Sequence, residues 1–259
     1  MTSVPSESKE KESRGHFAEL LKVEGKLALR EPTGLGVGIG LPIILLVVFG
    51  LIGIANPGNV ASTGYTVLDL YVPVIMVIGF IFLGIYCLPV TLVRYREMGW
   101  LRRVSTTPAP PSRLLAAQLI LNLVLALAAI LIVIFGSEFI FGAPLEVGIP
   151  YFILSIVLSI AVIFSLGLVV AALVPSQTVA TGLTGLLTFL LLFLSGLWIP
   201  PATVGGPLAT IMYYSPSGAA VRALLYSVFN TAPPYTAIVT MVAYTVVFAF
   251  IAIRYFRWE

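Results

Sequence analysis

The residues best suited to chemistry lie in a basic segment, residues 94 to 113, between two long apolar stretches of the chain. Its charged side chains are Arg94, Arg96, Glu97, Arg102, Arg103 and Arg113. Such a cluster favours ionic contacts with anionic lipid headgroups or with a partner protein. The basic segment is therefore a candidate docking surface for another protein.

Catalysis at a protected site is not indicated, because the interiors of the apolar stretches carry no ionisable group to act as acid, base or ligand. The single histidine, His16, lies in the polar tail, and the single cysteine, Cys87, lies in an apolar stretch. No phosphate-binding loop of the form G-x-x-x-x-G-K followed by Ser or Thr occurs. We therefore expect this chain to carry no catalytic residue, no metal ligand and no ATPase site.

The composition indicates a membrane protein, with 59% apolar residues, 10% charged residues and a mean hydropathy of +1.07. About 20 apolar residues span a bilayer as a helix that satisfies its own backbone groups. This length predicts an all-α fold with six transmembrane helices at about 35–55, 67–93, 114–136, 150–174, 179–199 and 235–253. The predicted division is a tail at 1–34 and a transmembrane domain at 35–259.

The distribution of Lys and Arg predicts the orientation, since these residues accumulate on the cytoplasmic side. With six spans, thirteen of the fourteen fall on one side and only Arg222 on the other. Both termini are therefore expected in the cytoplasm, in a multi-pass protein of the cell membrane (plasma or inner). The net charge of +3 lies at membrane edges, where anionic lipids attract it, and does not indicate nucleic-acid binding.

Residues 16–30, before the first span, alternate apolar and charged side chains at near-helical spacing. The pattern predicts an amphipathic helix on the inner membrane surface. Two roles remain open for it, a membrane anchor or a lever that contacts a cytoplasmic partner. Its apolar face includes Phe17, Leu20, Leu21 and Leu27.

The basic segment itself predicts a second short amphipathic helix, because Met98, Leu101 and Val104 recur every three residues. Glu97 is either a solvated charge or a contact for a cationic groove on a cytoplasmic partner. Gly99 beside it would allow that partner to approach closely.

The fifth predicted span carries small hydroxyl side chains on one helical face, Thr181, Thr184, Thr188 and Ser195. This face either packs against other helices or forms a dimer seam or conduit for an uncharged cargo. Ser155 and Ser159 repeat the pattern in the fourth span. Residues 200–235 predict short external or re-entrant helices with aromatic residues at headgroup level. A seventh span through 207–228 is the competing fold.

Several motifs occur in an order that resembles the permeases of type 2 ATP-binding-cassette (ABC) transporters, which export drugs, antibiotics and lipid-linked polysaccharides. Arg96-Glu97-x-Gly99-x-Leu101-x-Arg103 followed by Thr107-Pro108 resembles a characteristic cytoplasmic segment of that family. The other similar motifs, in chain order, are Arg30-Glu31-Pro32, Leu41-Pro42-Ile43, Leu194 to Pro200, and Ser215-Pro216 to Arg222.

The resemblance implies an exporter permease that pairs with a second permease copy, identical or related, and docks two separate ATPase subunits that hold ATP and Mg. It further implies multidrug or lipid efflux across the membrane, driven by those ATPases. The implied coupling residues are Arg96, Glu97, Met98, Gly99, Trp100, Leu101, Arg102, Arg103, Thr107 and Pro108. A structural or sensory membrane subunit, or a facilitator without an ATPase partner, is the alternative.

Overall fold

Within the residues that the computed structural model describes, 21–22, 24–27, 36–55, 66–99, 112–143 and 147–256, the chain is helical and contains no strand. Six helical segments are long and apolar enough to cross a membrane. The predicted all-α fold with six spans is therefore confirmed. The first span joins η1 (Gly36–Gly40) to α3 (Leu41–Ala55), and the second joins α4 (Val67–Ile81), η3 (Phe82–Cys87) and α5 (Leu88–Glu97). The third span is α7 (Ser112–Phe135) with η4 (Gly136–Ile140), and the others are α8 (Ile149–Leu173), α9 (Gln177–Leu194) and α13 (Tyr235–Tyr255).

The span ends differ from the sequence prediction by a few residues. The second span continues to Glu97 and the third to Ile140, because a helix can continue past the apolar stretch that identifies it. The fifth ends at Leu194 rather than 199, since Gly196 takes a positive φ of 86° and Pro200-Pro201 cannot continue the helix.

Three short helices fill the connection between the fifth and sixth spans: α10 (Pro201–Val204), α11 (Gly206–Tyr214) and α12 (Pro216–Val228). The competing seventh span is not formed, because Ser215 is extended (ψ 157°) and caps α12 through its side chain, which accepts from the Gly218 N–H at 3.0 Å. Pro216 then occupies the first position of α12, where its missing N–H has no helical acceptor to lose.

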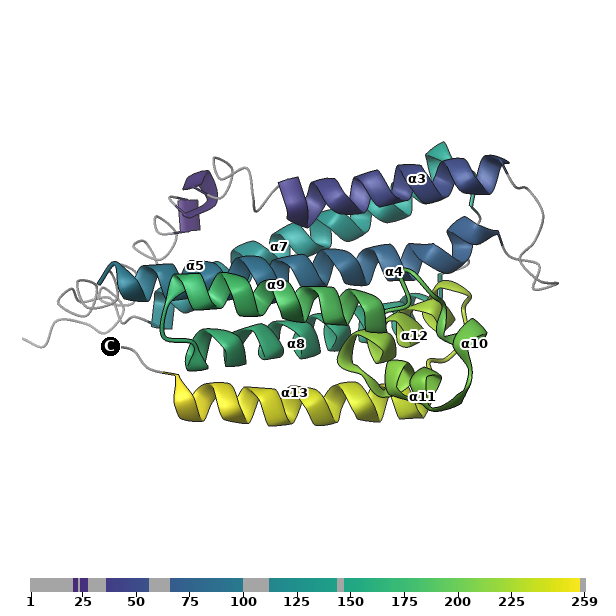
Figure 1. Cartoon of the computed structure of the whole chain (residues 1–259). Coiled ribbons are helices and arrows are strands. Elements are labelled where there is room, and N and C mark those ends of the chain that lie inside the picture. The colour runs from purple at the N-terminus through teal and green to yellow at the C-terminus, as the bar shows by residue number, and fades with distance from the viewer. Residues whose placement is uncertain are drawn as a thin grey trace, which may run out of the picture.

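The spans run alternately in opposite directions, so connections gather at two ends of the bundle (Figure 1). The end of α5, the α8–α9 connection and the end of α13 share one end. The three short helices α10, α11 and α12 lie at the other. The two ends of the bundle are therefore two separate candidate regions for function.

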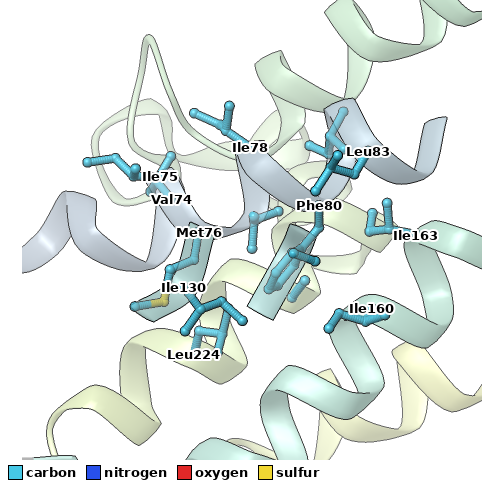
Figure 2. Close-up of a cluster of buried hydrophobic side chains, with 14 of the residues drawn as sticks. Val74, Ile75, Met76, Ile78, Phe80, Leu83, Ile130, Ile160, Ile163 and Leu224 are labelled. Carbon is cyan, nitrogen blue, oxygen red and sulfur yellow. The ribbon is translucent and has the colours of Figure 1, made fainter. Parts of the chain in front are cut away.

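The second span is the centre of the packing, with 72% of its most apolar window buried, against 17% for the sixth span. Figure 2 shows side chains of this span in contact with residues of α7, α8 and α12. The fully or nearly fully buried set includes Val74, Ile75, Met76, Ile78, Phe80, Leu83, Ile130, Ile160, Ile163 and Leu224. The outer helices leave their apolar faces for lipid.

The second and fourth spans are in backbone contact where two glycines meet. A Cβ added to Gly167 would lie 1.8 Å from the carbonyl oxygen of Gly84, so the two backbones are in direct contact. Small residues permit such contact between membrane helices. Gly84 lies in the π-helical turn η3, just before Pro89, and a wider turn accommodates a proline that has no N–H to donate.

Candidate functional site

Arg96, in the last turn of α5, binds the carboxyl end of α8. Its guanidinium donates from Nη1 to the carbonyl oxygen of Ala171 at 3.2 Å and from Nη2 to the carbonyl oxygen of Val174. The last carbonyls of a helix have no partner within the helix and carry partial negative charge. A cation that donates hydrogen bonds to these carbonyls supplies both the missing donors and the opposite charge.

Glu97, the next residue, binds the amino end of α9. Its Oε1 accepts a hydrogen bond from the backbone N–H of Gln177, the first residue of that helix, at 3.0 Å. The first N–H groups of a helix are unpaired and carry partial positive charge, which favours a carboxylate. Ser176 caps the same helix through its side chain, which accepts from the Val179 N–H at 3.4 Å.

These two neighbouring side chains therefore hold both sides of the connection between α8 and α9, residues 174–176. We call this arrangement the Arg96–Glu97 clamp. Each charge has the sign that its helix end attracts, so exchanging the two would oppose both helix dipoles. The clamp ties the end of the second span to the start of the fifth.

Gly99 ends α5 in the left-handed conformation, with φ of 65°, and its N–H donates to the carbonyl oxygen of Arg96 at 3.0 Å. An added Cβ at Gly99 would meet no atom of a described residue within 4 Å. Glycine is therefore favoured here by the left-handed backbone conformation, a role that the sequence interpretation had not assigned to it. Met98 beside it has 61% of its surface exposed.

The remainder of the predicted coupling segment lies outside the described residues. This applies to Trp100, Leu101, Arg102, Arg103, Thr107 and Pro108. The second amphipathic helix, predicted from Met98, Leu101 and Val104, is therefore described only up to Gly99.

Glu24, in the segment before the first span, is a buried carboxylate, with 3% of its surface exposed. It accepts hydrogen bonds from the Tyr95 hydroxyl at 2.8 Å and from Nε2 of Gln118 at 2.7 Å. It thereby joins the pre-span segment to α5 and to α7. Its partner on α5, Tyr95, directly precedes Arg96. Two charge-assisted hydrogen bonds offset part of the cost of burying the carboxylate.

Sequence reasoning missed Glu24 because it treated the charges of residues 16–30 as solvent-facing. The signal was present, since Glu24 follows Leu21 by three residues and so shares a helical face with it. Leu21 is half-buried and Leu27 has 47% of its surface exposed, whereas Phe17 and Leu20 lie outside the described residues.

The four hydroxyl residues of the fifth span do not share one environment. Thr184, Thr188 and Ser195 are at most 5% exposed, whereas Thr181 is exposed. Thr181, Thr184 and Ser195 donate to carbonyl oxygens of their own helix at 2.7 to 3.2 Å. Thr188 Oγ1 is buried and has no hydrogen-bond partner within the described part of the chain. In the single chain, three of these hydroxyls therefore face other helices.

The serines of the fourth span connect helices. Ser155 Oγ lies 2.7 Å from Ser227 Oγ of α12 and donates to the carbonyl oxygen of Ala223 at 3.2 Å. Ser159 Oγ contacts Met241 Sδ of α13 at 3.9 Å. Both serines are fully buried, which corresponds to the packing interpretation of this pattern.

Among the described residues, no three His, Cys, Asp or Glu side chains lie together in a group that could hold a metal ion. At this end of the molecule, the described charged side chains bind helix ends and a neighbouring segment.

Comparison with known protein families identifies the family of this chain. The family model of the ABC-2 type transporter matches residues 16–229, which extend from the tail through the end of α12. No curated protein matches the chain. The matched region includes Glu24, the Arg96–Glu97 clamp and five of the six spans. The chain therefore belongs to the ABC-2 type transporter family, as a multi-pass membrane permease subunit of an ABC transporter.

Proposed function

We propose that this permease exports a hydrophobic or amphiphilic substrate, such as a drug, a lipid or a lipid-linked glycan, from the cytoplasm or the inner leaflet. The family implies association with ABC ATPase subunits. In the proposed complex, two such subunits supply ATP and Mg, and a second permease copy completes the path. Residues 1–34 form the cytoplasmic tail, residues 35–259 form the transmembrane domain, and both termini face the cytoplasm.

The observation that carries this proposal is the Arg96–Glu97 clamp. A displacement applied to the segment after α5 acts through Arg96 on the end of α8 and through Glu97 on the start of α9. Two membrane spans would then respond to one cytoplasmic contact. A partner that changes shape during ATP hydrolysis needs such a connection, because interactions must differ between two states to shift a conformational equilibrium.

Glu24 extends the same connection to the tail. Because it accepts from both Tyr95 and Gln118, a movement of the pre-span segment acts on α5 and α7 as well. This contact supports the lever role for the predicted interfacial helix over the simple anchor role. The tail and the segment after α5 would receive the force of the ATPase together.

The proposed class of substrate follows from the distribution of charge. In the described spans, ionisable acidic and basic side chains lie near the ends, at Asp69, Arg94, Glu97, Glu138 and Arg254 among others. A path through uncharged helix centres suits an apolar or amphiphilic molecule better than an ion, since ions need compensating polar groups inside the membrane.

The test separates coupling from docking. The permease is purified with its ATPase, and ATP hydrolysis is measured with and without substrate for E97A, R103A and the double variant. We expect E97A to retain the ATPase and lose substrate stimulation, because the clamp transmits force. We expect R103A to weaken ATPase binding.

Matched controls are E138A, an exposed carboxylate in η4, and R254A, at the end of α13. Both should retain binding and stimulation. If the double variant keeps both the complex and the stimulation intact, the coupling proposal is wrong. If no ATPase co-purifies with the wild-type chain, a structural subunit or facilitator becomes the better description.

A further inference from the structure

Arg222 lies in α12, at the end of the bundle opposite the Arg96–Glu97 clamp (Figure 1). The sharp turn from α11 to α12 positions it. A Cβ on Gly218 would lie 1.9 Å from the carbonyl oxygen of Met212, so the two helices are in backbone contact at this turn. Gly218 and Arg222 share a helical face at i, i+4 spacing. The turn therefore brings the end of α11 back over Arg222.

Among the described residues, the neighbours of the guanidinium are aromatic rings and a hydroxyl rather than a carboxylate. Its Cζ lies 5.3 Å from the ring centre of Tyr213 and 5.8 Å from that of Tyr214. Nη2 donates to Thr236 Oγ1, in the first turn of α13, at 2.7 Å. Cation–π contacts hold the group in place but leave its net charge uncompensated.

Most hydrogen-bonding capacity of Arg222 is unused within the described part of the chain. Nε is buried without a partner. Nη1 makes no hydrogen bond to a described residue, and Arg222 as a whole is only partly buried. An unpaired buried donor is costly, and an incoming anion would lower that cost by compensating the charge.

Asp69, at the start of α4, is a buried acidic group. Its burial would favour an ion pair with Arg222. Its Oδ2 instead accepts from the Thr66 N–H at 2.8 Å in a capping box. Glu138 is exposed on η4. No ion pair joins either carboxylate to Arg222 among the described residues.

Aromatic side chains place this end at the level of lipid headgroups. Trp198, Tyr214, Tyr226 and Tyr235 each have between 40% and 79% of their surface exposed near α10 to α13. Trp and Tyr collect at the membrane–water interface, where lipid phosphates also lie. The side-chain hydroxyls of Tyr213 and Tyr214 make no hydrogen bond to a described residue.

We propose that Arg222, with the hydroxyls of Tyr213 and Tyr214, binds the phosphate group of a phospholipid headgroup at this end of the permease. Guanidinium and phosphate form strong charge-assisted hydrogen bonds, and phenolic hydroxyls donate to the remaining oxygens. The inference does not rest on the coupling role of Arg96 and Glu97, which lie at the opposite end.

The test measures lipid binding to the purified full-length chain by native mass spectrometry and by the shift in unfolding temperature. The probes are phosphatidylglycerol, the phosphate-free digalactosyldiacylglycerol, and inorganic phosphate. We expect R222Q to weaken phosphatidylglycerol binding about tenfold, the effect of losing a charged hydrogen bond. Binding of the phosphate-free lipid should not change.

Two further variants separate binding from packing. T236V removes the internal hydrogen bond but keeps the charge, and it should retain phosphatidylglycerol binding. R254Q removes an arginine that also lies near an aromatic ring, Tyr255 at 6.0 Å, and should bind as the wild type does. R222K keeps the charge but lacks the planar guanidinium, so it should weaken binding by a smaller factor. If R222Q does not fold, R222K replaces it in the test.

Unchanged phosphatidylglycerol binding in R222Q, or in R222K where R222Q does not fold, would overturn the proposal. An equal loss in T236V or in R254Q would do the same, because it would assign Arg222 to packing or to general charge attraction. If inorganic phosphate displaces the lipid, the site recognises the phosphate group alone. If it does not and R222Q still loses the lipid, the site requires a headgroup held in the membrane.

Discussion

The carboxylate of Glu97 accepts a hydrogen bond from the backbone N–H of Gln177, 80 positions further along the chain, at 3.0 Å. The contact joins the last residue of α5 to the first residue of α9. Arg96 makes the corresponding contacts with the end of α8. The end of the second span and the connection between the fourth and fifth spans therefore behave as one unit.

Replacing Glu97 with Gln should lower the free energy of unfolding by less than about 1 kcal/mol, because the site is exposed and an amide oxygen can still accept. The loss should shrink as salt is added, since salt screens a surface charge from the helix dipole. Thermal unfolding at two salt concentrations measures both effects. A loss that is independent of salt would show that the charge does not matter.

Replacing Glu24 with Ala should destabilise the protein by about 2–3 kcal/mol, because two buried hydrogen bonds to a carboxylate are lost. Y95F, which removes one of them, should cost about 1 kcal/mol. Unfolding temperatures of both variants and of the double variant E24A/Y95F give the coupling between the two groups. Lys26, exposed in the same segment, supplies the control K26A. If E24A loses no more stability than K26A, the carboxylate does not hold the segment.

Replacing Gly99 with Ala should cost about 1 kcal/mol, because φ of 65° is unfavourable for a residue with a Cβ. No clash with a described residue contributes, since none of their atoms lies within 4 Å of the added Cβ. G99N should recover part of the loss, as Asn tolerates this conformation better. The order Gly, Asn, Ala in unfolding temperature is the expected result. Equal stability of the three would contradict a left-handed end to α5.

Replacing Gly167 with Ala should be among the most damaging single-methyl changes, because the added Cβ would meet the carbonyl oxygen of Gly84 at 1.8 Å. Overpacking of this kind costs about 1–3 kcal/mol. G182A, on α9, is the matched control, since its Cβ would meet nothing within 4 Å. Expression level and unfolding temperature compare the two. Similar behaviour of both variants would place Gly167 away from a tight helix crossing.

The membrane class and the six spans could be predicted from local sequence. In lipid a helix must satisfy its own backbone groups, so the length of an apolar stretch is sufficient to identify a span. For the segment at 200–235 the sequence predicts short helices, and the structure forms α10, α11 and α12 there.

The ends of the spans were less accurate, because hydropathy does not show where a helix ends. Leu194 ends α9 because Gly196 turns the backbone, although Leu197, Trp198 and Ile199 continue the apolar run. Conversely, α5 continues through Arg94 and Arg96, which are polar.

The sequence by itself determined that Arg96 and Glu97 lie outside the lipid interior, beyond the apolar stretch of the second span, since charge is excluded from that interior. Only the tertiary structure decided what they bind. Their partners, at Ala171, Val174 and Gln177, are backbone groups exposed only because two other helices end there. Backbone partners have no side-chain signature, so no pattern of residue types could have identified them. For Glu24 the sequence indicates the helical face that it shares with Leu21, but only the tertiary structure brings its hydrogen-bond partners Tyr95 and Gln118 from two other helices.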